Sequence, residues 1–288
     1  MSQSTQTGLR DALRGVRALV LDADGVLVAP GTALPGVAEA IGRLDARGIP
    51  YRVATNVSAA HRETVAARFA GLGLPIPAER IVTSLSATVD DVRRTYPGQP
   101  VFVLTHRDGL REFADDPLMT PEAADADDAR AAAVVIGDAD NDLSYQNLDR
   151  AFRLVRRGAE LIAMHRNGWW LTARGETIDS GAFVAALEYA TGRRARLTGK
   201  PGPLMFRTAF RGLAADVAAA GGSALRYRDV AMVGDHSVQD ITGARRVGLR
   251  AILVLTGRTA AEDVPGLRGR AVPDAVAGAM GDVVAALD

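Results

Sequence analysis

The chain has 288 residues with equal numbers of basic and acidic side chains, so its formal net charge is zero. This balance gives no electrostatic reason to expect nucleic acid or an anionic membrane as a partner. The sequence holds no cysteine, which excludes disulfides, thiolate nucleophiles and cysteine-ligated metal sites. Residues 1–10 lack the apolar stretch of a secretory signal, and no apolar run approaches the ~18 residues of a membrane span. We therefore expect a cytoplasmic protein without a membrane segment.

Short apolar strands alternate with helical patterns, which predicts βαβ units and a mostly parallel sheet. In chain order, the first expected elements are strand 16–21, helix 36–47, strand 51–54, helix 59–71, strand 81–82 and helix 87–96. A second set has strands at 101–104, 132–136, 161–164 and 169–172 and helices at 110–113 and 145–155. The last set is helix 203–215, strand 229–233, helix 241–247, strand 250–255 and a final helix at 273–287.

This order indicates an α/β architecture that is interrupted and then resumed. We predict a doubly wound, Rossmann-like parallel sheet core formed by residues 14–82 and 191–288. Residues 83–190 would form an inserted α/β module, and residues 1–13 a flexible N-terminal tail.

Two carboxylates follow the first expected strand directly, in the segment Asp22-Ala23-Asp24-Gly25. Strand alternation would point Asp22 and Asp24 to the same side, where they repel each other and lose hydration. A bound cation would offset that cost, and hard oxygen ligands without histidine or cysteine nearby favour Mg²⁺. A solvated Asp-x-Asp-Gly turn is the alternative interpretation of these residues taken alone.

Lys200 is the only lysine among the 34 basic residues of the chain. It lies in a turn between Gly199 and Pro201, ahead of a helical segment. A site that must place one compact positive charge beside a phosphoryl group or a carboxylate favours lysine over the wide guanidinium of arginine. The alternative is an exposed lysine that has no specific role.

Other polar residues lie where expected strands end. Thr55 and Asn56 follow one strand, and Asp235 follows another. Because ligands of open parallel sheets bind at the carboxyl ends of the strands, we expect these residues to converge with Asp22 and Lys200. Together they supply carboxylates for a metal, a hydroxyl and amides for phosphate oxygens, and one ammonium. Phosphoryl transfer requires these groups, since its catalysis is mostly positioning and charge stabilisation.

The segments Asp22 to Leu27, Thr55-Asn56, Lys200-Pro201 and Gly234 to Asp240 resemble, in order, the four motif regions of haloacid dehalogenase-superfamily phosphatases. The position of the insert, between the second and third regions, resembles the type IIA (NagD-like) branch, in which the insert is a C2a cap. The resemblance implies that Asp22 is the nucleophile, that Asp24 is the general acid, and that Lys200 neutralises charge. It also implies that Thr55 and Asn56 bind phosphate oxygens, that Asp22, Asp235 and the backbone carbonyl of Asp24 hold Mg²⁺, and that Asp240 orients a metal-bound water or Lys200.

An acid at position 24 suits an oxygen leaving group, which favours phosphoryl transfer over carbon–halogen cleavage. We therefore expect hydrolysis of a small phosphorylated metabolite, a phosphomonoester or pyrophosphate. A catalytically idle relative that binds such a metabolite is one alternative, and a phosphotransferase with a small acceptor is another. Val57 and Val238 stand where many relatives carry Asn and Asp, so the fine phosphate contacts and the surroundings of the metal differ from the common pattern.

In the expected cap, His165 precedes a loop that could select substrate, with a plain surface turn as the alternative. Trp169 and Trp170 alternate in an expected strand, which predicts one in the core of the cap and the other at an interface. Caps of this type often mediate dimers, so a homodimer through the cap is a further expectation. His61 is expected to be solvated, and the acidic run 138–142 is expected to be a turn because it lacks the glycine and glutamate of a calcium loop.

Overall fold

The structure is a computed structural model that describes residues 3–172 and 175–287. The chain divides into two compact units. The first unit comprises Met1–Thr55, Glu63–Val82 and Lys200–Asp288, and the second comprises Asn56–Arg62 and Thr83–Gly199. These units differ from the expected core and inserted module in two places, because residues 56–62 and 191–199 belong to the second unit.

The first unit is built on a six-stranded sheet with the strand order β14-β13-β12-β1-β4-β5. The strands are β1 (Ala18–Leu21), β4 (Tyr51–Thr55), β5 (Ile81–Thr83), β12 (Val230–Gly234), β13 (Arg250–Val254) and β14 (Ala275–Ala277). β1 pairs in parallel with both β12 and β4, and β13 pairs in parallel with β12 and β14. All residues of β1 are buried, as expected of a strand that is covered on both faces. The Rossmann-like parallel sheet predicted from the sequence is confirmed.

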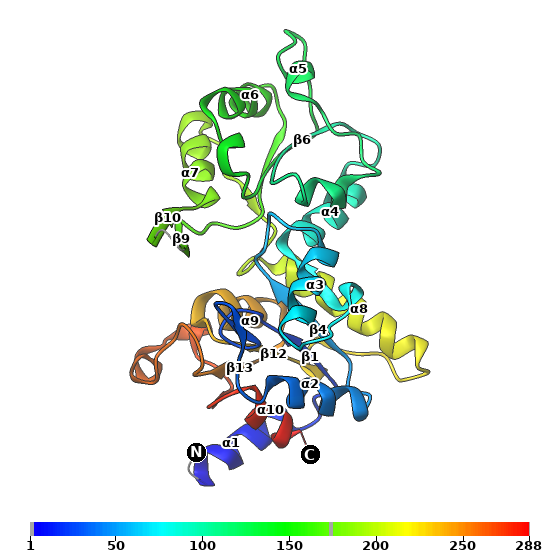
Figure 1. Cartoon of the computed structure of the whole chain (residues 1–288), viewed down its shortest axis with the longest axis vertical. Helices are drawn as coiled ribbons and strands as arrows, with labels where there is room; N and C mark the ends of the chain where they lie inside the picture. The colour runs from blue at the N-terminus through cyan, green and yellow to red at the C-terminus, as the bar shows by residue number, and fades with distance from the viewer. Residues whose placement is uncertain (1–2, 173–174, 288) are drawn as a thin grey trace. The chain divides into compact units, whose positions relative to one another are not determined.

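Helices cover this sheet on both faces (Figure 1). The helices are α2 (Val37–Ala46), α3 (Arg62–Gly71), α8 (Pro203–Ala219), α9 (Gly243–Val247) and α10 (Met280–Ala286). α8 packs on β4, β1 and α9, whereas α2 packs against α10. A short hairpin of β2 (Val28–Ala29) and β3 (Thr32–Ala33) follows β1. The strand order runs outward in both directions from β1 and β12, so the topological switch point lies between these two strands.

Both ends of the chain differ from the sequence-based expectation. Residues 3–13 form a helix, α1 (Gln3–Leu13), where residues 1–13 were expected to be a flexible tail. Leu9 and Leu13 are spaced i, i+4 on one face of α1, and both are buried where the helix packs against β14 and α10. The expected final helix at 273–287 is instead β14 followed by the shorter α10, because the alanine-rich segment 275–277 pairs with β13.

The second unit has a four-stranded parallel sheet with the order β11-β8-β7-β6. Its strands are β6 (Val101–Leu104), β7 (Ala133–Ile136), β8 (Glu160–Ala163) and β11 (Arg196–Leu197). Its helices are α4 (Ser84–Thr95), α5 (Pro121–Ala124), α6 (Tyr145–Arg156) and α7 (Ser180–Thr191), and the 3₁₀ segment η2 (Gly109–Phe113) follows β6. The 3₁₀ segment η1 (Ala78–Arg80) precedes β5 and belongs to the first unit. Val134 and Ile136 of β7 pack with α6 and α7, whereas Ala133 and Val135 pack with α4. The alternation of β7 thus separates two apolar clusters, one on each face of the sheet.

A two-stranded antiparallel hairpin, β9 (Trp169–Thr172) and β10 (Gly175–Ile178), extends from this unit. The prediction that one of its two tryptophans lies in a core is wrong, because Trp169 and Trp170 are 49% and 47% exposed. They face opposite sides of the hairpin, where Trp169 pairs with Ile178 and Trp170 with Thr177, and about half of each tryptophan is exposed. Among residues 3–172 and 175–287, no helix combines the length and the apolarity that a membrane span requires.

Candidate active site

Three of the residues singled out from the sequence lie at the carboxyl ends of neighbouring strands in the first unit. Asp22 directly follows β1, Thr55 is the last residue of β4, and Asp235 directly follows β12. β1 lies between β4 and β12 in the sheet, so these three ends adjoin at one edge. All three residues are buried, with exposed fractions of 2–7%. The edge is at the topological switch point, where open α/β sheets bind their ligands.

Lys200 contacts two carboxylates at this edge. Its Nζ atom lies 2.5 Å from Oδ1 of Asp22 and 2.7 Å from Oδ1 of Asp240. The lysine is 3% exposed and Asp240 is completely buried. The alternative interpretation of Lys200 as an exposed lysine is therefore wrong.

Asp235 completes a cluster of three buried carboxylates. One carboxylate oxygen each of Asp22, Asp235 and Asp240 lies within 4.8 Å of the others, and no other such group occurs among the described residues of the chain. Two glycines crowd the Asp235 carboxyl group so closely that a Cβ atom at Gly25 or Gly257 would overlap it. The glycine of the Asp-x-Asp-Gly segment is thus required by close packing as well as by its positive φ of +77°.

Asp240 is held by hydrogen bonds to both of its carboxylate oxygens. Oδ1 accepts from Lys200, and Oδ2 accepts from the backbone N–H of His236 at 3.0 Å. Asp240 lies in the π-helical turn η5 (Ser237–Thr242) that follows β12. This arrangement supports a role for Asp240 in orienting Lys200, which the sequence comparison with the superfamily motifs had implied.

The electrostatics of the cluster favour the binding of a divalent cation. Burial raises the pKa of Asp22 well above its ordinary value, and repulsion from Asp240 adds to this effect, while Lys200 opposes it. Burial and the Asp240 charge also raise the pKa of Asp235. Burial disfavours the charged form of Lys200, but Asp22 and Asp240 outweigh it and raise the lysine pKa. When all three carboxylates are ionised, they and the Lys200 ammonium carry two excess negative charges, which a divalent metal ion would neutralise. The buried oxygen donors therefore fit Mg²⁺ or a similar hard cation.

Asp24 does not belong to the three-carboxylate cluster. β1 ends at Leu21, so strand alternation does not extend to position 24, and Asp24 instead lies in a turn that forms an isolated bridge with Val28. Its side chain is exposed, yet partial desolvation raises the pKa of its carboxyl group, while the Lys200 charge lowers it. A raised pKa is the property that a general acid needs near neutral pH.

Asn56 and His165 lie in the second unit. His165 is 3% exposed, and its Nε2 atom lies 3.0 Å from Ser58 Oγ and 3.2 Å from Ser180 Oγ. Its Nδ1 atom accepts from the backbone N–H of Asn167 at 3.4 Å, which assigns the proton of the neutral ring to Nε2. Burial lowers the pKa of His165 and keeps the ring neutral. Both nitrogens are engaged within the second unit, which favours an indirect role over direct substrate contact.

The sequence interpretation missed several residues that shape the site. Gly257 and Arg258 lie after β13, and the Arg258 backbone N–H donates to Asp235 at 2.6 Å. The Thr256 hydroxyl donates to the carbonyl oxygen of Gly25 at 2.5 Å. The only signal for these residues in the sequence is their position after an expected strand.

The chain is similar to proteins of known class. The haloacid dehalogenase-like hydrolase family matches residues 19–116, and the related HAD-hydrolase-like family matches residues 197–282. The chain is 33% identical over 250 residues to haloacid dehalogenase-like hydrolase domain-containing protein 2 of Bos taurus, covering 87% of this chain and 88% of that protein. It is 31% identical over 252 residues to phospholysine phosphohistidine inorganic pyrophosphate phosphatase of Homo sapiens, covering 85% of each.

Solved structures show the same similarity. The 4-nitrophenylphosphatase of Thermotoga maritima has a TM-score of 0.81 and 26% identity, over 96% of this chain and 99% of that one. NagD of E. coli K-12 has a TM-score of 0.78 and 25% identity, over 92% of this chain and 97% of that one. Fold, site and similarity together define an enzyme, a hydrolase with a Rossmann-like sheet. The chain belongs to the haloacid dehalogenase-like hydrolase family, and the predicted membership of its NagD-like phosphatase group is confirmed.

Proposed function

We propose that the protein is a Mg²⁺-dependent phosphatase that hydrolyses a small phosphorylated metabolite, a phosphomonoester or pyrophosphate, through an aspartyl-phosphate on Asp22. The observation that carries this proposal is the contact of Lys200 with Asp22 and Asp240 at the carboxyl edge of the sheet. The neighbouring carboxylate of Asp235 supplies the remaining charge for a metal site.

The reaction would proceed in two displacements. A carboxylate oxygen of Asp22 attacks phosphorus, the bond to the leaving oxygen breaks, and Asp24 donates its proton to that oxygen. Asp24 then accepts a proton from a water molecule that attacks phosphorus, which releases inorganic phosphate and restores the Asp22 carboxylate. Lys200 stabilises the negative charge that Asp22 and the phosphoryl oxygens share during both steps.

The remaining residues bind or position. Asp22, Asp235 and the backbone carbonyl of Asp24 would hold Mg²⁺, which supplies positive charge for the phosphoryl oxygens when bound. Asp240 keeps Lys200 in place. The Thr55 hydroxyl and the Asn56 amide would bind phosphate oxygens.

The second unit is proposed to act as the cap that excludes bulk water during the reaction. Within it, His165 would influence substrate choice through Ser58 and Ser180 rather than by direct contact. The cytoplasmic location and a homodimer through this unit stay predictions from the sequence.

The substrate class follows the chemistry of the site and the names of the relatives. Desolvation raises the pKa of Asp24, which suits a carboxyl group that protonates an oxygen leaving group, as in phosphate esters and pyrophosphate. One relative is named for action on pyrophosphate, phospholysine and phosphohistidine, and one structural neighbour for action on 4-nitrophenyl phosphate. These compounds are therefore the first substrates to assay.

The test is a panel of phosphate esters and pyrophosphate, assayed with Mg²⁺ and with a chelator. We expect hydrolysis that requires the metal and is lost in Asp22→Asn. Mass spectrometry of the acid-quenched enzyme should show a phosphoryl group on the peptide that contains Asp22. Activity that persists in Asp22→Asn or in excess chelator would contradict the proposal.

A further inference from the structure

Ser84 contacts two chain segments that adjoin proposed active-site residues. One segment begins at Asn56, directly after Thr55, and the other ends at Gly199, directly before Lys200. Ser84 is the first residue of α4 and is completely buried. Its Oγ atom lies 3.0 Å from the carbonyl oxygen of Asn56 and 2.9 Å from that of Val57. The single hydroxyl proton is therefore shared between two consecutive carbonyls, in a three-centre hydrogen bond. Asn56 follows Thr55 in the chain, so Ser84 holds the backbone directly after the proposed phosphate-binding threonine.

Ser84 also packs against the residue that precedes Lys200. A Cβ atom on Gly199 would lie 3.0 Å from Ser84 Cβ and 2.6 Å from Asn56 Oδ1, so these three residues are in close contact. The Gly199 N–H donates to the carbonyl oxygen of Met164 at 2.9 Å. Because Met164 directly follows β8, this hydrogen bond holds Gly199 beside the carboxyl end of that strand. Only a residue without a side chain fits this position.

Buried hydroxyl groups continue this contact toward Thr198. The Thr88 hydroxyl donates to the carbonyl oxygen of Ser84 at 2.6 Å, and the oxygens of Thr88 and Thr198 lie 2.7 Å apart. Thr198 also lies 3.1 Å from the carbonyl oxygen of Ala163. Ser84, Thr88 and Thr198 are all 0% exposed. The row of hydroxyls thus links the start of α4 to the residues just before Lys200.

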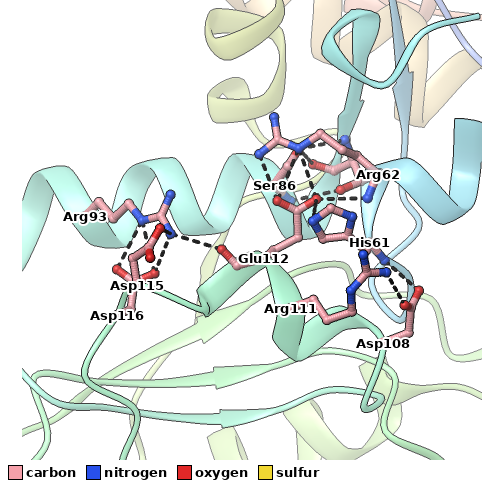
Figure 2. Close-up of polar contacts among 10 residues, drawn as sticks. His61, Arg62, Ser86, Arg93, Asp108, Arg111, Glu112, Asp115 and Asp116 are labelled. Atoms are coloured by element: carbon pink, nitrogen blue, oxygen red, sulfur yellow. Dashed lines mark hydrogen bonds and ion pairs between the residues drawn. The ribbon is translucent and has the colours of Figure 1, made fainter.

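The far end of the segment that begins at Asn56 is held separately (Figure 2). The backbone N–H of His61 donates to Asp108 at 2.9 Å, and that of Arg62 donates to Glu112 at 2.9 Å. The Arg62 guanidinium pairs with the same Glu112 carboxylate at 2.8 Å. Asp108 and Glu112 hold the His61–Arg62 end of the segment independently of Ser84. Loss of the Ser84 hydroxyl would therefore loosen the backbone at the Asn56 end.

We propose that Ser84 is a positioning residue for phosphate binding: its hydroxyl and its packing on Gly199 together hold the backbones that lead to Thr55 and to Lys200. Ser84 touches no reacting atom in this proposal and acts through Asn56 and Gly199. The inference rests on the proposed function, since it assigns Thr55, Asn56 and Lys200 to the binding of the phosphoryl group.

The test compares Ser84→Ala with Ser86→Ala. Ser86 lies on the same helix, is 3% exposed, and hydrogen-bonds with Thr83 at the start of α4, so its loss removes a buried hydroxyl that bonds to Thr83 rather than to Asn56. We expect Ser84→Ala to weaken the binding of inorganic phosphate in the presence of Mg²⁺ about tenfold, the value of one buried hydrogen bond. Ser86→Ala should stay within about twofold of wild type. Thr88→Val removes another hydroxyl of the same row without a change in side-chain shape, and it should weaken phosphate binding by an intermediate factor. This variant replaces Ser84→Ala in the comparison if Ser84→Ala does not fold.

Hydrogen exchange gives a second readout that needs no catalysis. Ser84→Ala should speed amide exchange in peptides that cover Asn56 to Ser58 and Gly199 to Lys200, whereas Ser86→Ala should affect only the start of α4. Equal phosphate binding and equal exchange in the two variants would overturn the role of Ser84 and leave the proposed function standing. A wild type that binds phosphate but hydrolyses no ester would contradict the proposed function alone. The role of Ser84 could then still be tested, because phosphate binding and hydrogen exchange in Ser84→Ala and Ser86→Ala do not require catalysis. A wild type that binds no phosphate would overturn both proposals.

Discussion

Lys200 Nζ lies 2.5 Å from Asp22 Oδ1, and this contact joins the only lysine of the chain to the residue that follows β1. The same nitrogen lies 2.7 Å from Asp240, and all three side chains are at least nine-tenths buried. A buried ammonium between two carboxylates keeps its charge and holds the Asp22 carboxylate in one orientation. The spacing suits a compact ammonium, whereas a guanidinium would need more room and a different geometry.

Lys200→Arg should therefore reduce kcat by at least about a hundredfold, because an oriented charge at the reacting centre is worth roughly 3 kcal/mol of transition-state stabilisation. The measurement is steady-state hydrolysis of 4-nitrophenyl phosphate, with thermal unfolding as a check on folding. The matched control is Arg207→Lys, which makes the opposite exchange at an exposed position of α8 and should leave kcat unaltered. Near-normal turnover in Lys200→Arg would mean that the site needs only a positive charge.

Asp24→Asn should slow the hydrolysis of substrates with a basic leaving group more than that of substrates with a weakly basic one. If Asp24 protonates the leaving oxygen, the loss for an alkyl phosphate should be about 10²–10⁴-fold. The loss for 4-nitrophenyl phosphate should be much smaller, because nitrophenolate leaves without a proton. The measurement is kcat/KM for both esters in wild type and Asp24→Asn. Equal losses on the two esters would show that Asp24 does not act as the acid.

The position of the site at the carboxyl edge of the sheet could be predicted because its signals are local. An apolar strand that ends in a polar residue is visible in the sequence, and the parallel order of β1, β4 and β12 then brings Asp22, Thr55 and Asp235 together. Lys200 was visible because its residue type is unique in the chain.

The contacts that hold these residues in place depend on pairs far apart in the chain. Gly257 packs on Asp235, and Ser84 bonds to Asn56, although neither carries a chemical signature of its own. The segment 275–277 illustrates the same limit, because alanine favours a helix while pairing with β13 makes it a strand. His61, which was expected to be solvated, lies with its Nε2 atom 3.7 Å from the Glu112 carboxylate, a partner that no local pattern indicates.

Mg²⁺ should stabilise the protein more at pH 7.5 than at pH 5. The folded-state pKa values of Asp22 and Asp235 are raised above 3.8, so the metal-free protein loses stability as pH rises through those values and the carboxylates ionise. Mg²⁺ binds the ionised form and offsets this loss. At a Mg²⁺ concentration about ten times Kd, the stabilisation is about 1.4 kcal/mol, or an increase in Tm of roughly 2–4 °C.

Differential scanning calorimetry with Mg²⁺ or chelator at matched ionic strength measures this effect. Asp235→Asn should abolish the increase in Tm, whereas Asp142→Asn, from the acidic turn of the second unit, should retain it. An increase that is equal at both pH values, or that survives in Asp235→Asn, would place the metal elsewhere.

Glu112→Gln should destabilise the protein in a manner that depends on pH. Glu112 pairs with Arg62 (Figure 2). The Glu112 side chain is 2% exposed and that of Arg62 is 34% exposed. Burial alone would raise the Glu112 pKa, but hydrogen bonds and the charge of Arg62 outweigh it and lower the pKa below 4.5. The pair therefore adds stability above about pH 4.5, and this stability is lost as pH falls through the lowered pKa. With a third of Arg62 still in solvent, we expect the loss in Glu112→Gln to be about 2 kcal/mol at pH 7.

Urea unfolding of wild type and Glu112→Gln between pH 7.5 and pH 3.5 checks this prediction. The difference between the two proteins should be constant above about pH 5.5 and should shrink below pH 4.5, since glutamate then becomes neutral like glutamine. Glu122→Gln, an exposed change in the same unit, should show little difference at any pH. A pH-independent difference for Glu112→Gln would mean that shape and packing, rather than the charge on Glu112, hold the start of α3.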